Sequence, residues 1–358
     1  MPLAPATLDA LLTQVLAARR AGTLADLIRQ RPRAARWLVR RHLAPILSAR
    51  GESATDERAI AEAIGILLRW GAAGLRPDRA GPHLADIEAS AWLDRTSWRP
   101  MLALACHFDL LAVPDFPHRY RRRNDEAAVD NLCGLWSVGT STFYRYLDKG
   151  RRLLAELLGE RTSGRRRVAL REAAMANADT IGDAAWHARQ SDAALARRDP
   201  AGSLWHLLRA GDAARFVNGL MRHRAELSGD EEIDALVEAC AAVDLARRIR
   251  FDLQLAHAAL WQTRGNETRA YAAYDEALQI ASLPEGDALL LGIVSGALGK
   301  FHESRDTDKA LACFQDSAEQ LRRAVEREEA PANREALCEY VASLQRLAWH
   351  YVMRNDPR

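Results

Sequence analysis

Apolar residues recur every three or four positions along almost the whole chain, which is the spacing of one face of an α-helix. The clearest example spans residues 53–73, where Ile60, Ile64 and Leu67 fall on one face. Residues with high helix propensity (Ala, Leu, Arg and Glu) dominate, while runs rich in Val, Ile, Thr and aromatic residues are nearly absent. The pattern predicts an all-α protein with almost no sheet.

Residues 135–158 show the pattern of a turn followed by an amphipathic helix. Positions 137–139 (Ser-Val-Gly) interrupt the helical periodicity, and hydroxyl residues that can begin a helix follow them. In the next helix Phe143 and Leu147 fall on one face, while Arg145 and Lys149 fall on the other. The stretch therefore predicts the turn and second helix of a helix-turn-helix.

The sequence LWSVGTSTFYRYLDKG resembles the helix-turn-helix of bacterial regulators and recombinases, in which a pattern of the type L-G-V-S-x-S-T-V-Y-R is common. Val138 stands at the apolar turn position, Phe143 at the first inward position of the second helix, and Cys133 where a small residue is preferred. Ser137 replaces the usual glycine. We expect this replacement to be tolerated only if the turn avoids a positive φ.

The resemblance implies which side chains would contact DNA. Base edges in the major groove would be reached by Thr140, Ser141, Tyr144 and Arg145. Phosphates would be met by Lys149, Arg151 and Arg152, and by an arm that carries Arg121, Arg122 and Arg123. Asp148 would lie on the same side and repel the backbone of DNA. Helical folds of this shape also serve as protein-binding modules, and burial of Tyr144 and Arg145 against other helices would favour that alternative.

The net charge of +2 conceals an uneven distribution. Residues 117–170 carry twelve Lys and Arg against six Asp and Glu, whereas the balance is acidic in residues 230–330. The basic region coincides with the predicted helix-turn-helix, which is the arrangement expected of a surface that binds phosphates.

Four segments in the second half of the chain, near Ala201, Ala235, Ala270 and Ala310, are similar to one another at spacings of about 34, 35 and 40 residues. Within residues 255–284, small residues at 258, 270 and 277 alternate with Trp261 and Tyr274 around a Gly-Asn turn. This unit resembles a tetratricopeptide repeat, and Phe301, Ala310 and Phe314 repeat it. The resemblance implies an α-solenoid that binds a protein or peptide.

The final helix, expected over residues 332–353, would close this array by burying Leu337, Tyr340, Leu344, Leu347 and Trp349. The complete division expected from the sequence has four parts. They are an N-terminal helical region (1–118), the helix-turn-helix with its following helix (119–160), a linker (161–172) and the tetratricopeptide-like repeats (173–358). The linker is expected because residues 161–172 hold Gly, Ser, Thr and a basic run without apolar periodicity.

Signatures of other classes of protein are missing from the sequence. There is no G-x-x-x-x-G-K-S/T, H-E-x-x-H or G-x-S-x-G, so we expect no enzyme, catalytic residue, metal or cofactor. The five dispersed cysteines are typical of reduced thiols in a cytoplasmic protein. The N-terminus lacks the order of a signal peptide, and no apolar run reaches the roughly 20 residues of a membrane span. His187 and His206, each beside a Trp, are expected to be half-buried core residues.

Two hypotheses follow for the function. The first is a non-enzymatic cytoplasmic regulator that binds DNA as a possible homodimer and uses its repeats to sense a partner or ligand. The alternative is an adaptor or scaffold that binds proteins or peptides through the repeats and does not bind DNA.

Overall fold

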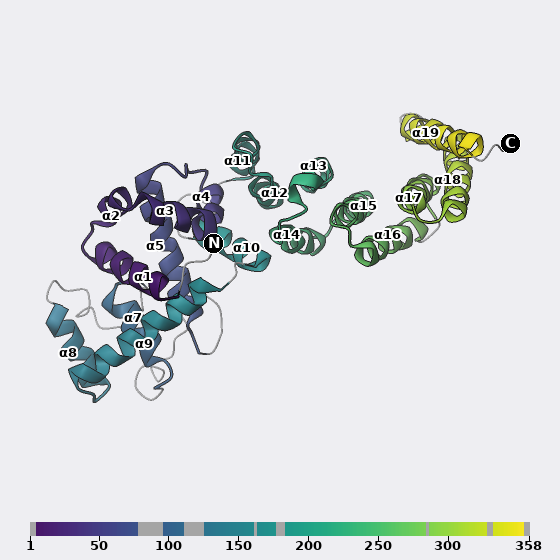
Figure 1. The fold of residues 1–358 in the computed structure, drawn as a ribbon. Coiled ribbons are helices and arrows are strands. Elements are labelled where there is room, and N and C mark those ends of the chain that lie inside the picture. Colours follow the sequence, from purple (N-terminus) through teal and green to yellow (C-terminus); the bar gives the residue numbers. More distant parts are fainter. Residues whose placement is uncertain are drawn as a thin grey trace. The chain divides into compact units, whose positions relative to one another are not determined.

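The computed structural model describes residues 5–77, 96–110, 125–160, 163–176, 183–283, 286–327 and 332–353. Every regular element in these residues is a helix and none is a strand, so the predicted all-α class is confirmed. The chain forms two compact units, Met1–Gly182 and Asp183–Arg358 (Figure 1).

The first unit is built around α5 (Glu57–Gly74), the helix whose apolar pattern is clearest in the sequence. Asp56 begins it by accepting hydrogen bonds from the backbone N–H groups of Arg58 and Ala59 at 2.9 and 3.4 Å. Among the described residues of this unit, the other α-helices are α1 (Pro5–Arg20), α2 (Leu24–Gln30), α3 (Pro32–Leu38), α4 (Ala44–Ala49), α7 (Arg99–His107), α8 (Asp125–Leu135), α9 (Thr140–Gly159) and α10 (Gly164–Ala176). The helices that pack on α5 include α2, α4, α7, α9 and α10, and they surround it in Figure 1.

A π-helical turn, Val39–Leu43, joins α3 to α4 and ends two residues before Pro45. A proline ring clashes with the carbonyl group four residues earlier in a regular helix, and a wider turn relieves that clash. The turn brings His42 fully into the core, where its ring meets Trp37 edge-on at 5.5 Å.

The expected linker is wrong, because most of it belongs to α10. This helix packs on α4 and α5 within the first unit. Its inward face includes two arginines: Arg166 donates to the carbonyl oxygen of Leu157 at 2.7 Å, and Arg171 donates to that of Pro45 at 3.4 Å. The boundary between the compact units therefore follows residue 182, and the basic run is part of a folded helix.

The second unit is a succession of helices. Those in its described residues are α11 (Ala184–Ala196), α12 (Pro200–Arg209), α13 (Ala213–Leu227), α14 (Glu232–Ala241), α15 (Arg247–Thr263), α16 (Glu267–Ser282), α17 (Ala288–His302), α18 (Thr307–Arg327) and α19 (Ala332–Met353). In this series α11 packs on α12, α15 on α16, and α17 on α18. Several positions of the proposed repeat pattern lie in the core of the unit: Ala258, Ala270, Ala277 and Ala310 are fully buried, and Tyr274 is 4% exposed.

The predicted inward face of α19 is only partly correct. Leu337, Leu344 and Trp349 are 49%, 42% and 60% exposed. Its buried residues include Ser343, which bonds to Ser317 of α18 at 3.2 Å, and His350, whose ring lies on Phe314 at 5.2 Å. The side of α19 that packs on α18 therefore includes polar side chains, while three of the five expected apolar residues are exposed and Tyr340 and Leu347 are half-buried.

Buried polar side chains hold α11 against α12. His187 and His206 meet through their Nδ1 atoms at 2.9 Å, and Ser191 and Ser203 meet through their hydroxyl groups at 2.8 Å. All of them are at most 2% exposed, so the two histidines are more deeply buried than the sequence suggested. Burial lowers the pKa of His187, with a smaller contribution from Arg209, and favours its neutral form.

Candidate nucleic-acid interface

The helices α7, α8 and α9 share one apolar core in the first unit. Trp98 and Met101 contribute from the side of α7, Leu132 from α8, and Phe143 from α9. Phe143 is fully buried and its ring stacks on that of Trp136 at 6.1 Å. The inward positions expected for Phe143 and Val138 are thus occupied as the sequence indicated, and they fix the start of α9 against the other two helices.

The turn between α8 and α9 depends on Ser137, which has a φ of 51°. The N–H of Ser137 donates to the carbonyl oxygen of Gly134 at 3.2 Å, and that of Val138 to Cys133 at 2.9 Å. This pair of bonds is the Schellman motif, which requires a left-handed residue at the position of Ser137. The expectation that the turn avoids a positive φ is wrong: the serine adopts the conformation that a glycine would adopt more easily.

The second half of α9 is held by close packing. A Cβ atom at Gly150 would overlap the backbone oxygen of Pro100, so α7 and α9 touch through their backbones there. Farther along, Leu154 of α9 packs over Gly71 of α5. The first half of α9 is packed on one side only, through Phe143, and its other side faces solvent.

Most of the residues expected to contact DNA lie on that open side. Tyr144 is 50% exposed, and the residues that are also exposed are Thr140, Ser141, Arg145 and Lys149. The guanidinium of Arg145 donates to the hydroxyl of Thr142 at 3.0 Å and pairs with no carboxylate among the described residues. Lys149 has no ion pair within the same part of the chain. Since residues four apart share a helix face, Ser141, Arg145 and Lys149 form one polar stripe.

Arg151 and Arg152 are placed differently from Arg145 and Lys149. Arg151 is paired with two carboxylates, Asp9 of α1 at 3.0 Å and Asp148 at 2.6 Å, and it also bonds to Thr13. Arg152, which is more exposed, shares Asp148 at 2.8 Å. The hydrogen bond from Arg151 holds the pKa of Asp148 below its usual range. Asp148 therefore faces two cations, and Arg151 joins α9 to α1.

One residue near this surface was missed by the sequence analysis. The guanidinium of Arg20, at the end of α1, lies 2.6 Å from Nε2 of His107. The ring of His107 lies 6.3 Å from that of Tyr144, which brings a further cation close to the exposed side of α9. The signal in the sequence was a pair of arginines in the last turn of the first helix, but nothing local connects it to a helix more than a hundred residues away.

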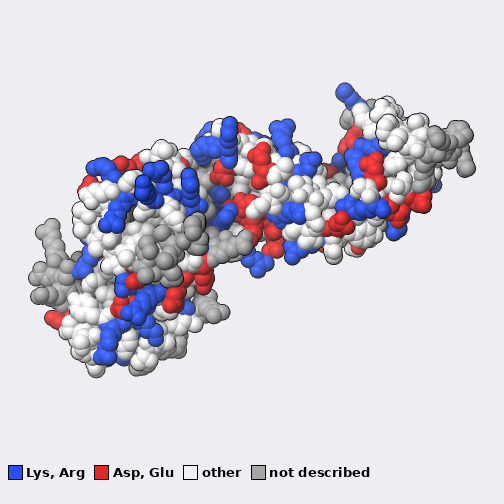
Figure 2. Space-filling view, viewed as in Figure 1, with Lys and Arg blue, Asp and Glu red and all other residues white. Residues whose placement is uncertain are grey.

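The expected arm, Arg121 to Arg123, lies outside the described residues. On the face seen in Figure 2, Lys and Arg side chains gather along α9 with Asp and Glu between them. The candidate interface on the described residues is therefore the exposed side of α9 and the adjoining end of α1.

The fold and this surface define an all-α protein with a three-helix motif that presents one helix to solvent. No family model matches the chain, and no curated protein or solved structure is significantly similar to it. Within the described residues, no group of three or more His, Cys, Asp or Glu side chains is placed to bind a metal ion. No helix in that part of the chain is both long and apolar enough to cross a membrane.

Proposed function

We propose that this chain is a DNA-binding regulator in which α7, α8 and α9 act as a helix-turn-helix and α9 enters the major groove. The observation that carries the proposal is the exposure of Tyr144 and Arg145 on a helix whose opposite side is firmly packed. A recognition helix needs this combination, because the side chains that read bases must be accessible while the backbone that carries them is held in place.

The charge on α9 supports the same proposal. Arg145 and Lys149 have no carboxylate partner in the described residues, so bringing a phosphate to them breaks no ion pair. Arg151 would act indirectly, since its bonds to Asp9 and Asp148 fix the position of α9 relative to α1. Of the seven positions on α9 expected to contact DNA, we retain six as direct contacts and assign Arg151 to positioning.

The test begins with selection of duplexes from a random-sequence library by the full chain, followed by fluorescence titration at about 50 and about 200 mM salt. We expect Tyr144→Ala combined with Arg145→Ala to reduce discrimination between a selected duplex and a scrambled one. Lys149→Ala should weaken binding to both duplexes equally and lower the salt slope by about 1.

Arg189→Ala is the matched control, because Arg189 is exposed on α11 in the second unit. The control should change neither affinity nor slope. Binding that is independent of salt, or equal in the control and the α9 variants, would contradict the proposal.

The second candidate function is an adaptor that binds proteins through the second unit. The observation that favours it is the exposed apolar stripe of α19, which includes Leu337, Val341 and Leu344. An exposed row of this kind is typical of a protein-binding surface, and in a regulator it could equally form a homodimer. Sedimentation velocity of the full chain and of Leu344→Glu separates these roles. If the full chain is a dimer and Leu344→Glu is a monomer, the stripe mediates self-association. If both proteins are monomers, the stripe is available to bind a different protein, as the adaptor function requires.

A further inference from the structure

A pocket of about 720 Å³ lies within the second unit between α11, α12 and α13. Its apolar side is formed by Leu195, Leu204, Leu207 and Met221, together with Pro200 at the start of α12. The volume is in the range of pockets that enclose a small organic molecule, and a predominantly apolar wall with a few polar groups is their usual composition.

The polar groups of the pocket come mainly from one side of α13. Arg215, Asn218 and Arg222 are spaced so that they share a helix face, and all of them line the pocket. No carboxylate is among the lining residues. The pocket therefore combines an apolar wall with a positively charged, hydrogen-bond-donating edge.

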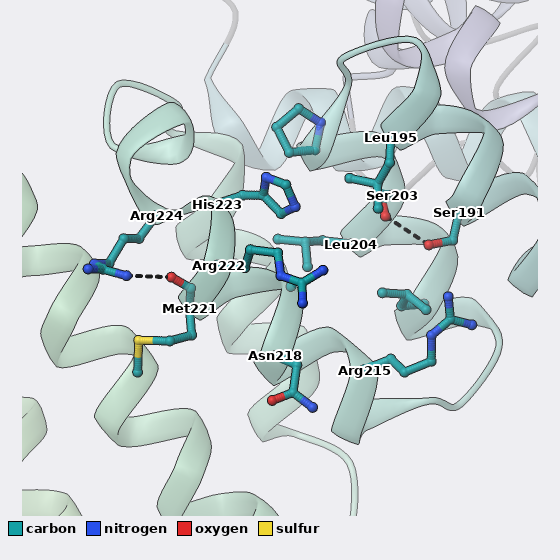
Figure 3. A pocket seen from close by; sticks show the side chains of 13 residues that line it. Ser191, Leu195, Ser203, Leu204, Arg215, Asn218, Met221, Arg222, His223 and Arg224 are labelled. Atoms are coloured by element: carbon teal, nitrogen blue, oxygen red, sulfur yellow. Dashed lines mark hydrogen bonds between the residues drawn. The ribbon is translucent and has the colours of Figure 1, made fainter.

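The arginines of this edge differ in how they are already bonded. Arg215 pairs with Asp192 at 2.7 Å, and Arg224 donates to the carbonyl oxygen of Met221 at 2.8 Å. Arg222 makes no hydrogen bond or ion pair within the described part of the chain. In Figure 3 its guanidinium lies at the centre of the lining side chains, whereas that of Arg224 lies to one side.

Ser191 and Ser203 also line the pocket, but they are less available than Arg222 to bind a ligand. The hydroxyl groups of Ser191 and Ser203 bond to each other at 2.8 Å, and both residues are buried (Figure 3). Their hydrogen-bonding capacity is partly used by the contact between α11 and α12. Arg222 and its neighbour Asn218 are thus the donors best placed to receive a ligand.

We propose that this pocket binds a small organic anion, with a carboxylate or phosphate head at Arg222 and an apolar body against the wall that includes Leu195 and Leu204. A guanidinium binds either head through paired N–H···O bonds, and Asn218 can add a further donor. The apolar body replaces water chiefly at Leu195, which is 38% exposed, and a bare anion lacks this favourable contribution. This proposal does not depend on DNA binding, and its test involves no DNA.

The probes are octanoate, octyl phosphate, octanol and acetate, each titrated into the full chain labelled with carbon-13 at its methionine methyl groups. The chain has five methionines, and Met221 is the one that lines the pocket. We expect the Met221 signal to shift saturably with at least one of the two octyl anions. Octanol and acetate should bind at least tenfold more weakly, because each lacks one half of the ligand. Comparing the two anions identifies the preferred head.

Arg222→Leu should weaken binding of the preferred anion at least tenfold, and Arg222→Glu should abolish it. The matched control is Arg250→Leu, since Arg250 is exposed on α15 and does not line the pocket. An unchanged circular dichroism spectrum and melting temperature would show that each variant is folded. Three outcomes overturn the proposal: no shift with either octyl anion, octanol binding as tightly as the anions, or equal effects of Arg222→Leu and Arg250→Leu.

Discussion

Gly150 of α9 lies directly against the backbone of Pro100 in α7, so closely that a Cβ atom on the glycine would overlap the carbonyl oxygen. Backbone atoms cannot rotate away as a flexible side chain can, and α9 would have to move as a whole to admit a methyl group. The orientation of the proposed recognition helix thus depends on the absence of one carbon atom.

We predict that Gly150→Ala destabilises the packing of α7 on α9 by about 1–3 kcal/mol. The measurement is hydrogen exchange resolved to the amides of both helices, which should exchange faster in the variant. Gly134→Ala is the control, because a Cβ atom at Gly134 in α8 meets nothing within 4 Å. That control should be neutral or slightly stabilising, as alanine favours a helix. Equal exchange in the two variants would mean that α9 shifts at no cost.

At the turn, Ser137→Gly should stabilise the first unit by about 0.5–1 kcal/mol. The serine has a φ of 51°, a region in which glycine experiences no clash with a Cβ atom. Ser137→Val should destabilise by more than about 1 kcal/mol, because a β-branched residue is strained there. Thermal unfolding of the full chain ranks the three proteins. A valine variant as stable as the glycine variant would show that the turn changes its conformation.

The role assigned to Arg151 predicts an energetic coupling with Asp9. Arg151→Met and Asp9→Asn should each loosen α1 from α9, and the double variant should be less destabilised than the sum, by about 0.5–1 kcal/mol. Lys149→Met, which removes a cation that pairs with no carboxylate among the described residues, should leave stability unchanged. The double-mutant cycle is measured by urea unfolding, and additive effects would remove Arg151 from its positioning role.

His42 predicts a dependence of stability on pH. Burial, followed by the charges of Arg166 and Arg41, lowers the pKa of its ring from 6.5 to about 3. Below about pH 6.5 the unfolded chain binds a proton at this site and the folded protein does not, until about pH 3. The free energy of unfolding should therefore decrease as the pH is lowered from about 6.5 to about 3, by about 1.4 kcal/mol per pH unit. Calorimetry of His42→Leu should show a flatter profile than the original chain, and parallel profiles would contradict the assignment.

The exposure of α19 predicts unequal effects of two similar truncations. Phe314→Ala in α18 should destabilise by about 3–5 kcal/mol, because the side chain is fully buried against Gly299 and His350. Leu344→Ala, at a side chain that is 42% exposed, should change stability by less than about 0.5 kcal/mol in the monomer. A large loss for Leu344→Ala would indicate that another surface covers the stripe.

The sequence predicts some elements better than others for identifiable physical reasons. The start of α9 was predicted correctly because Val138 and Phe143 stand at the two apolar positions of the helix-turn-helix pattern, which lie close together in the sequence on either side of the start of the helix. The helix α10 was missed because its inward face includes arginines: the guanidinium of Arg166 lies over the ring of Trp70 at 5.0 Å, a contact across distant parts of the chain. A buried arginine looks the same in a sequence as a solvated one.

The candidate site shows the same limit. The sequence placed Arg145 on the polar side of the predicted helix, but it left open whether Tyr144 and Arg145 are exposed, because other helices could have covered them. The pairing of Arg151 with Asp9 joins residues 142 positions apart, so no spacing on α9 could separate its role from that of Lys149. On α19 the periodicity was clear but the choice between two adjacent stripes was not, because only the position of Phe314 and Ser317 decides which one is covered.

The contact between His187 and His206 has room for a single hydrogen. An Nδ1···Nδ1 distance of 2.9 Å is a hydrogen bond, so one ring must carry its proton on Nδ1 while the other carries it on Nε2. Two residues of the same type, each beside a tryptophan, are thereby made chemically different. The hydrogen bond between α11 and α12 therefore has one donor ring and one acceptor ring. Nitrogen-15 spectra of the two imidazoles would show which histidine donates.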